Sequence, residues 1–562
     1  MTPTANNPLI LLVSPDAVER DELVGRLRAD CVGYRVMGAA GLNEAADVLG
    51  HVVATGTGIA LVISVHRLPD GSATELFAQL KASAPGARRI LLTTLDQADA
   101  ALQAIAQALV DRYLVLPAEP LPERLLPIVD DLLEDWATQY RAVPVGVTVL
   151  GHRFAAGSHL VKDYLTRSLI PFTWLDLSED AEAMAMAREL NLPVPAPTTV
   201  LFDDGRALYD PSITELAVAL GLTEEASLDR YDLLVVGGGP AGLAAAVNAA
   251  TDGLAVCIVE DDCPGGQATA VVSRLEDRAG LPTGLTGADF AHRALAQARR
   301  LGVQWCSARV AETLMPLRNA HRVVLAGGDV LVGKTVLIAT GMSWRTLDAP
   351  GIAELTNAGV YYGNTSTEMA LTTGEEVVVC GSGDAAARAA LDLAEHARSV
   401  VLSVAEPSLR RAPMSAELAD LLSAHERISV YCGTEVGEVR GYGRLEKVVL
   451  VDLDGQTTQV FNASSLYVLT GMVPSSRWVS DSVALDELGF VLTGLDVVRR
   501  PELLPQAWDQ DRPPLPMETS VPGVFAAGDV RAGSIKRIGG AIGQGGTCVA
   551  AIGQYLEEHS LE

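Results

Sequence analysis

Short apolar runs recur along the whole chain and alternate with stretches of helical periodicity. In the first 140 residues five such runs predict strands, at 9–13, 34–36, 59–64, 89–94 and 113–116. Because strands that alternate with helices usually pair in parallel, residues 1–140 are expected to form a five-stranded parallel α/β sheet. After a linker around residues 141–144, a second alternation predicts a smaller α/β unit at 145–226.

From residue 230 the pattern becomes that of a dinucleotide-binding fold. An apolar strand at 232–236 leads directly into Gly237, Gly239 and Gly242, which open a helix of small residues. In this spacing, two glycines allow a tight turn and close approach of a pyrophosphate, and the third packs the helix on the strand. Glu260, 18 residues after Gly242 at the end of the next apolar run, is placed to accept a ribose hydroxyl.

Further motifs follow in a fixed order. They are Gly265-Gly266-Gln267, Ala339-Thr340-Gly341, a second fingerprint with Gly381, Gly383 and Ala386, Leu469-Thr470-Gly471, and the run from Thr519 to Arg531 that contains Gly528 and Asp529. Together these motifs resemble those of the low-molecular-weight thioredoxin reductases, and the resemblance covers the chain from about Tyr231 onward. It implies an FAD-binding domain at 230–345 and 472–562 and an NAD(P)H-binding domain at 346–471, both Rossmann-like.

The resemblance also implies roles for single residues. Asp529 would hold the ribityl chain of FAD, and the helix that starts near Lys536 and Arg537 would point its N-terminal end at the flavin. The segment Gly265-Gly266-Gln267 would contact the flavin ring. Gly341 would lie where the chain crosses between the two nucleotide domains.

The expected nicotinamide site lacks the family's markers. Val404 stands at the position that matches Glu260, where an acid would favour NAD, and the family's His-Arg-Arg for the 2′-phosphate of NADP is absent. Arg410 and Arg411 follow closely and could bind a phosphate, although a solvated surface pair fits the pattern equally well. Both NADPH and NADH remain open.

The redox dithiol of the family is missing as well. Where thioredoxin reductases carry Cys-Ala-Thr-Cys, this chain has Gly363-Asn364-Thr365-Ser366, and no Cys-x-x-Cys occurs among its seven cysteines. An alcohol cannot replace a thiolate in disulfide exchange. Tyr362, Asn364 and Ser366 are therefore candidates for contacts with a substrate, with packing against the ring as the alternative for the tyrosine. Cys263, two residues before the expected flavin contact, is the one cysteine with a candidate redox role.

The N-terminal regions resemble two other folds without their chemistry. Residues 1–140 resemble a flavodoxin-like response-regulator receiver, but Ser14-Pro15 replaces its acidic pair, Val65 its phosphoacceptor and Leu116 its lysine. This pseudo-receiver is expected to take no phosphate and to serve docking or dimerisation. Residues 145–226 resemble a glutaredoxin or thioredoxin with Ala155-Ala156-Gly157-Ser158 in place of the Cys-x-x-Cys.

Composition limits the classes of partner and the cellular compartment that we expect for this protein. With 70 acidic and 42 basic side chains the net charge is −28, which argues against nucleic acid or an anionic membrane as partner. We expect a cytoplasmic protein, because the N-terminus has no signal-like region, no apolar run reaches membrane length and the cysteines lack disulfide spacing. We also expect a homodimer. No residues have metal-ligand spacing. The proline-rich stretch 501–516 predicts an extended loop, either a tolerated insertion or a lid or subunit contact.

Three functions fit this multidomain α/β chain. The first is an FAD-dependent enzyme that passes electrons from NAD(P)H to a non-disulfide acceptor, either a small molecule or a protein. The second is a flavin-holding redox sensor or scaffold. The third is a disulfide reductase that uses a lone cysteine such as Cys263.

Overall fold

The computed structural model describes residues 7–31, 33–54, 58–84, 86–94, 109–117, 120–139, 147–202, 204–270, 286–318, 320–363, 372–454, 457–500, 502, 508, 510 and 512–559. The chain divides into two compact units, Met1–Val143 and Pro144–Glu562. Each unit has apolar cores of its own.

The first unit is built on a five-stranded parallel sheet, as the apolar pattern predicts. The strand order is β2-β1-β3-β6-β7, an order shared by doubly wound α/β proteins. The strands are β1 (Leu9–Val13), β2 (Arg35–Ala39), β3 (Ile59–Val65), β6 (Arg88–Thr94) and β7 (Arg112–Leu116). The helices are α1 (Ala17–Asp30), α2 (Leu42–Ala54), α3 (Ala73–Ser83) and α5 (Leu121–Gln139), and a small hairpin pairs β4 (Arg67–Leu68) with β5 (Gly71–Ser72).

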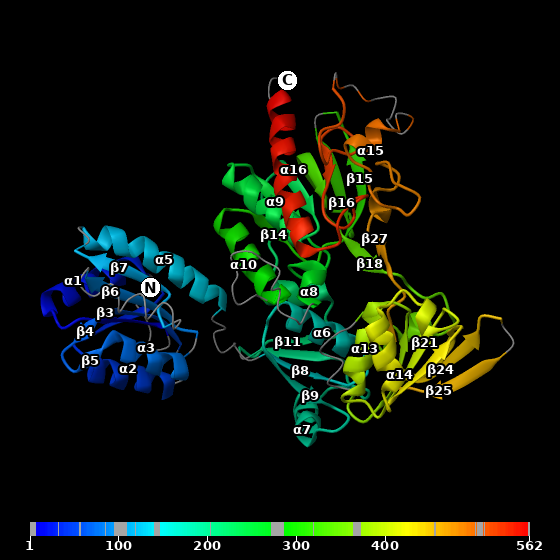
Figure 1. Cartoon of the computed structure of the whole chain (residues 1–562), viewed down its shortest axis with the longest axis horizontal. Coiled ribbons are helices and arrows are strands. Elements are labelled where there is room, and N and C mark those ends of the chain that lie inside the picture. Colours follow the sequence, from blue (N-terminus) through cyan, green and yellow to red (C-terminus); the bar gives the residue numbers. More distant parts are fainter. Residues whose placement is uncertain are drawn as a thin grey trace. The chain divides into compact units, whose positions relative to one another are not determined.

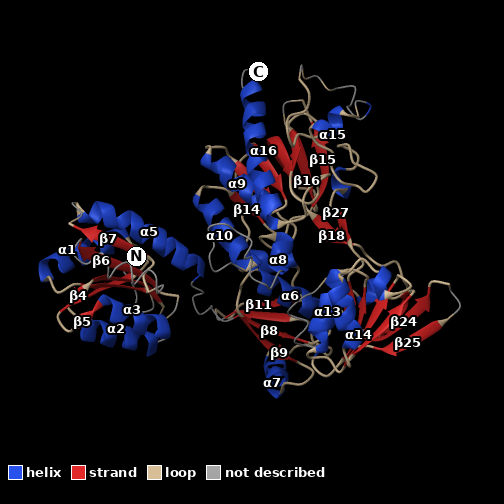
Figure 2. Cartoon of the chain, in the orientation of Figure 1, coloured by secondary structure: helices blue, strands red, loops and turns tan. Residues whose placement is uncertain are grey.

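The second unit begins with a four-stranded mixed sheet in the order β11-β10-β8-β9. Its strands are β8 (Val147–Gly151), β9 (Phe172–Asp176), β10 (Thr199–Phe202) and β11 (Ala207–Tyr209). Helices α6 (Ala156–Arg167) and α8 (Ile213–Ala219) share one apolar cluster with the sheet, and α7 (Ala181–Glu189) joins a separate cluster (Figure 2). These strands and helices lie within residues 147–219.

A seven-stranded sheet follows and is completed from the far end of the chain. Its path is β14-β13-β12-β17-β16-β15, and β28 pairs with β17. The strands are β12 (Tyr231–Val236), β13 (Val256–Val259), β14 (Gln304–Cys306), β15 (Ala311–Pro316), β16 (His321–Leu325), β17 (Val330–Ile338) and β28 (Val524–Ala526). The helices are α9 (Pro240–Thr251), α10 (Gly287–Arg300), α15 (Leu495–Val498) and α16 (Ile538–Glu558), and α16 lies beside α9 (Figure 1).

In the sequence, a second domain of the dinucleotide-binding type lies between β17 and β28. A short antiparallel pair, β18 (Met342–Trp344) with β27 (Met472–Pro474), joins the chain entering and leaving it. Its parallel sheet has the order β19-β26-β20-β21-β22 and stands beside a three-stranded antiparallel sheet, β23-β24-β25. The strands are β19 (Val360–Tyr362), β20 (Glu376–Cys380), β21 (Ser399–Val404), β22 (Ile428–Cys432), β23 (Thr434–Gly441), β24 (Leu445–Asp452), β25 (Thr458–Asn462) and β26 (Ser465–Val468), with helices α11 (Ile352–Leu355), α13 (Asp384–Ala394) and α14 (Ala416–Ala424).

Candidate functional site

The three glycines of the first fingerprint have different surroundings at the end of β12. Gly237 has a φ of +107°, and a Cβ there would lie 2.4 Å from the carbonyl oxygen of Ala339. A Cβ on Gly242 would lie 1.9 Å from the carbonyl oxygen of Gly237, so helix and strand meet backbone to backbone. A Cβ on Gly239 would have no heavy atom within 4 Å. Gly239 therefore faces open space at the N-terminus of α9, where a phosphate is favoured.

Glu260 follows β13 directly and lies against this loop. Its carboxylate accepts hydrogen bonds from the backbone N–H of Gly238 and, at 3.0 Å, from that of Asp262. The side chain is buried, and burial, followed by the charge of Asp261, raises the pKa of the Glu260 carboxyl. The acid expected at the ribose thus sits beside the glycine loop.

The expected flavin-contact segment packs on the same loop. The backbone N–H of Gly265 donates to the carbonyl of Gly238 at 2.8 Å, and a Cβ on Gly266 would lie 3.5 Å from the Cα of Gly239. The side-chain amide of Gln267 donates to the carbonyl of Met342, one residue after Gly341. The structure therefore gathers three motifs, the outermost of which, at Gly237 and Gly341, are 104 positions apart in the sequence.

The run from Thr519 to Arg531, here called the return segment, adds β28 to the seven-stranded sheet and carries Asp529. The backbone N–H of Gly528 donates to Gln544 of α16 at 2.9 Å, and Lys536 donates to the carbonyl of Asp529. Oδ1 of Asp529 is buried and has no hydrogen-bond partner among the described residues, and burial raises the pKa of this carboxyl. Arg537 is the residue directly before α16, which begins at Ile538 as expected. An unpartnered buried carboxylate oxygen is an acceptor that fits a ligand hydroxyl.

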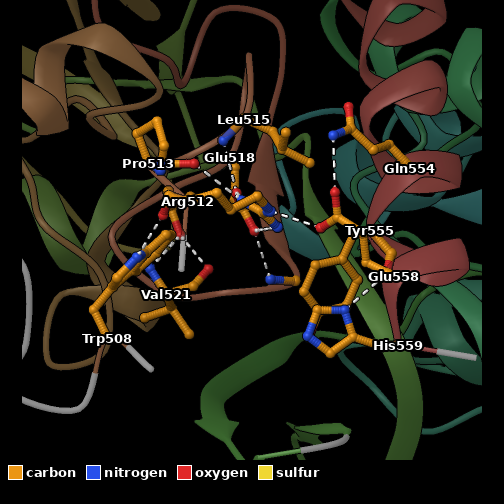
Figure 3. A network of polar contacts seen from close by, with 12 residues as sticks. Trp508, Arg512, Pro513, Leu515, Glu518, Val521, Gln554, Tyr555, Glu558 and His559 are labelled. Carbon is orange, nitrogen blue, oxygen red and sulfur yellow. Dashed lines mark hydrogen bonds and ion pairs between the residues drawn. The ribbon is translucent and has the colours of Figure 1, made fainter. Parts of the chain in front are cut away.

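A polar network outside the sequence predictions holds the return segment in place (Figure 3). The carboxylate of Glu518, which is fully buried, accepts from Leu515 N at 2.7 Å and from Gly523 N at 3.0 Å. Arg512 donates to Glu518 at 2.6 Å and to Glu558 of α16 at 2.7 Å. Arg512 thus ties Glu518, which lies directly before the Thr519–Arg531 run, to the C-terminal helix.

The four-stranded unit also contacts the flavin-contact segment. Arg167, at the end of α6, donates to Thr269 Oγ1 at 3.1 Å and to the carbonyl of Gly266 at 3.3 Å. Its guanidinium pairs with Asp262 at 2.6 Å and with Asp163 at 3.1 Å. The cation from α6 therefore joins this unit to the loop that follows β13.

The segment after this unit is fixed along β14. Thr223 Oγ1 donates to the carbonyl of Ser307 at 3.0 Å, and the backbone N–H of Glu224 donates to that of Trp305 at 2.8 Å. The side chain of Glu224 pairs with Arg299 at 3.3 Å. Sequence reasoning missed these contacts and Arg167, because polar residues of this kind look like an ordinary solvated helix end and linker.

The second fingerprint has the same backbone register as the first. Gly381 N donates to Ser403 O at 3.0 Å, just as Gly237 N donates to Val259 O at 2.8 Å. Val404 therefore occupies the place of Glu260, and its side chain is fully buried. Gly383 opens α13, within which Ala386 is buried as expected for tight helix packing.

The two candidate phosphate ligands lie in the loop after β21. Arg410 pairs with Asp420, and Arg411 is exposed. Both lie in a short 3₁₀ turn at Leu409–Arg411.

Candidates for substrate contact have separate positions. The hydroxyl of Tyr362 accepts from Leu347 N at 3.1 Å, within the nucleotide-type domain. Cys263 is fully buried in the cluster that contains Tyr164, and burial raises the pKa of its thiol. Asn364 and Ser366 lie outside the described residues. Within the described ranges, no group of His, Cys, Asp and Glu residues could hold a metal ion.

Among the helices that the structure describes, none is both long enough and apolar enough to cross a membrane.

Comparison with known proteins places this geometry in a family. The alkyl hydroperoxide reductase F protein of Staphylococcus epidermidis is 29% identical over 360 residues, which are 63% of this chain and 65% of that protein. The protein of the same name from Staphylococcus aureus is 28% identical over the same shares. The match thus spans just under two thirds of the length of these relatives.

Solved structures with similar chains include thioredoxin reductases. That of Lactococcus lactis has 23% identity and a TM-score of 0.48, over 58% of this chain and 99% of its own. That of T. acidophilum has 24% identity and a TM-score of 0.48, over 59% and 99%. The model of the family described as pyridine nucleotide-disulphide oxidoreductase, which implies FAD and NAD(P)H, matches residues 231–545. This match covers more than half of the chain, and the chain belongs to the pyridine nucleotide-disulphide oxidoreductase family.

Proposed function

We propose that this protein is an FAD-dependent oxidoreductase that takes electrons from NAD(P)H and passes them to a non-disulfide acceptor, either a small molecule or a protein. The observation that carries the proposal is the buried, unpartnered Oδ1 of Asp529 in the same domain as a glycine loop with an open face at Gly239. An acceptor without a donor and a backbone without a neighbour are both features that a bound dinucleotide would complete.

The residues around this loop fit FAD. Gly237, Gly239 and Gly242 would admit the pyrophosphate at the start of α9, and Glu260 would face the ribose. The remaining contacts would come from Gly265, Gly266, Gln267, Gly341, Gly528, Asp529, Lys536 and Arg537. FAD, when bound, accepts a hydride from a nicotinamide and releases electrons singly or in pairs.

The acceptor is proposed to be a non-disulfide because the chain offers no dithiol. No Cys-x-x-Cys occurs in the sequence, and the segment where the resemblance places one reads Gly363-Asn364-Thr365-Ser366. Cys263, two residues before the flavin-contact segment, is a poor substitute, because its thiol is buried and its pKa is raised. A thiol held in its protonated form is a weak nucleophile.

The N-terminal regions are proposed to act without redox or phosphoryl chemistry. In the four-stranded unit, Ala155 and Ser158 stand where a thioredoxin carries its cysteines, and Arg167 anchors the unit to the flavin-contact segment. We propose that this unit is a fixed part of the flavoprotein rather than a mobile carrier. The first unit, a pseudo-receiver with Val65 at the acceptor position, is proposed to serve docking or homodimerisation.

Anaerobic stopped-flow absorbance tests the enzyme. Mixing the yellow protein with NADH and, separately, with NADPH should bleach the flavin at a catalytic rate with at least one of them. A quinone or a one-electron dye should then restore the colour. A flavin that neither nucleotide bleaches would contradict the enzyme and favour the flavin-holding sensor.

A thioredoxin assay tests the acceptor. Thioredoxin-dependent reduction of dithionitrobenzoate should be negligible, and alkylation of the cysteines should leave dye reduction unchanged. Robust thioredoxin turnover that Cys263→Ser abolishes would instead support the lone-cysteine reductase.

A further inference from the structure

The place where a dinucleotide-binding fold normally distinguishes its two nicotinamide cofactors is apolar in the second nucleotide domain. That place is the residue after the second strand, where an acid would bind the ribose 2′-hydroxyl of NAD. The shared backbone register puts Val404 there, and its side chain is fully buried in the apolar core of this domain. Val404 can neither accept a hydrogen bond from a ribose hydroxyl nor bind a phosphate, so a contact with either group needs another residue.

The loop that follows β21 lies against the second glycine loop. The backbone N–H of Ala405 donates to Ser382 Oγ, between the two glycines, at 3.3 Å. At the other end of this loop, the backbone N–H of Ser415 donates to Asp384 Oδ1 at 2.8 Å. The segment 405–415 is thus tied at both ends to the residues that would border a bound dinucleotide.

Glu406 is the acid of this segment, and it directly follows Ala405, whose backbone contacts the glycine loop. Its backbone carbonyl accepts from Gly433 N at 2.8 Å, which fixes the residue at the ends of β21 and β22. Oε2 of Glu406 is buried and has no hydrogen-bond partner among the described residues. Burial, and then the charge of Glu406, raises the pKa of the Cys432 thiol, so the Glu406 carboxylate lies near the end of β22.

The cations nearby do not neutralise this carboxylate in the structure. Arg410 pairs with Asp420, and both side chains are largely exposed. Arg411 is exposed in the same 3₁₀ turn. A second acid, Asp384, stands at the first helical position after Gly383.

We propose that Glu406 selects NADH over NADPH, by accepting a hydrogen bond from the ribose 2′-hydroxyl of NADH and repelling the 2′-phosphate of NADPH. This inference rests on the proposed function, because it concerns the nucleotide site of the same oxidoreductase. A buried acceptor without a donor gains a hydrogen bond from a hydroxyl. A phosphate at the same place brings like charges together in a partly buried site, where they repel strongly.

Equilibrium binding to the oxidised, FAD-loaded protein tests the selection without turnover. ADP and 2′,5′-ADP are the probes, because they report on the 2′-phosphate, and isothermal titration calorimetry gives both dissociation constants. The wild type should bind ADP at least tenfold more tightly. Glu406→Gln should remove most of this preference, and Glu406→Arg should reverse it. Glu417→Gln, which removes one exposed carboxylate from the same domain, should leave the preference unchanged.

The outcomes separate this inference from the proposed function. Equal binding of the two probes, tighter binding of 2′,5′-ADP, or a preference that Glu406→Gln leaves intact would overturn the role of Glu406. In those cases bleaching of the flavin by NADPH or NADH would still support the oxidoreductase. If neither probe binds and neither nucleotide bleaches the flavin, both proposals fail. Retained yellow colour and circular dichroism show that each variant is folded.

Discussion

Single glycines divide the FAD fingerprint into positions that serve the fold and a position that serves the ligand. A Cβ on Gly242 would lie 1.9 Å from a backbone oxygen, whereas a Cβ on Gly239 would have no neighbour within 4 Å. Gly239→Ala should therefore leave stability nearly unchanged and weaken FAD binding by roughly 100-fold, or about 2.8 kcal/mol. Gly242→Ala should destabilise the domain by about 3 kcal/mol, because backbone atoms must move.

Urea unfolding and flavin titration distinguish the two glycine variants. Gly553→Ala is the control, because a Cβ there meets no atom within 4 Å and lies inside α16. It should stabilise the protein slightly, since alanine favours a helix by about 1 kcal/mol over glycine. A folded Gly239→Ala protein with full yellow colour would refute the assignment of this loop to the pyrophosphate.

A buried histidine gives the flavin-binding domain a pH dependence. Burial lowers the pKa of His321 in β16 to about 4. In the unfolded chain the imidazole of His321 is protonated below about pH 6.5, whereas in the folded domain it is protonated only below about pH 4. Stability should therefore fall between pH 6.5 and pH 4 by about 3 kcal/mol.

Denaturant midpoints measured at pH 7, 5.5 and 4.5 test this histidine. His321→Gln should flatten the decline, whereas His396→Gln, at an exposed position, should not. A decline of the same size in both variants would assign the pH dependence to other groups.

Some residues of the candidate site could be predicted from the sequence and others could not. Glycines and acids at fixed spacing, such as Gly237 and Glu260, were predictable because the dinucleotide fold requires them locally. Arg167 was not, because its partners Gly266 and Thr269 lie 99 and 102 positions away. Only the fold brings such pairs together, and a lone arginine at a helix end is an ordinary surface residue in sequence.

At the scale of elements, Arg512 couples the segment that leads into β28 to the last helix, α16. Arg512 lies between Glu518, which is fully buried, and Glu558, whose side chain is 36% exposed (Figure 3). Arg512→Met should cost about 3–5 kcal/mol, because it leaves the charge of Glu518 buried without its cation. The return segment should then loosen, and the protein should also lose FAD more readily.

The other half of this network supplies a matched control. Glu558→Gln should cost no more than about 1 kcal/mol, because ion pairs near the surface contribute little. Urea unfolding and the rate of flavin release measure both variants. Equal losses in the two would mean that the helix contact, and not the buried pair, holds the return segment.

Elements themselves were largely predictable from the apolar pattern. The strands expected at 9–13 and 232–236 agree with β1 and β12, and the helix expected near Arg537 begins at Ile538. The stretch 501–516 was expected only as an extended loop, yet it contains Arg512. Pattern reasoning finds stretches that bury one face, but it cannot show which polar side chain of a loop meets a partner in another element.

At the scale of the whole molecule, the second unit should suffice for the flavin. All contacts described around Gly239 and Asp529 lie within Pro144–Glu562. A protein made of residues 144–562 should therefore fold, turn yellow and keep the FAD affinity of the full chain within about threefold, a difference below 1 kcal/mol. Flavin fluorescence titration of the two proteins measures this, and a colourless 144–562 protein would show that the first unit completes the site.

The discontinuity of the seven-stranded sheet sets the order in which the flavin cradle can form. Its first strands come from residues 231–338, but β28 and the helix that carries Gln544 follow only after the intervening nucleotide domain. During synthesis, the early strands must wait while nearly two hundred further residues emerge between β17 and β28. A chain that ends before β28 has an incomplete seven-stranded sheet and should bind no flavin, so it should be colourless. Flavin colour should therefore appear only after β28 and α16 have been synthesised, and the apolar surface of the early strands stays exposed until then.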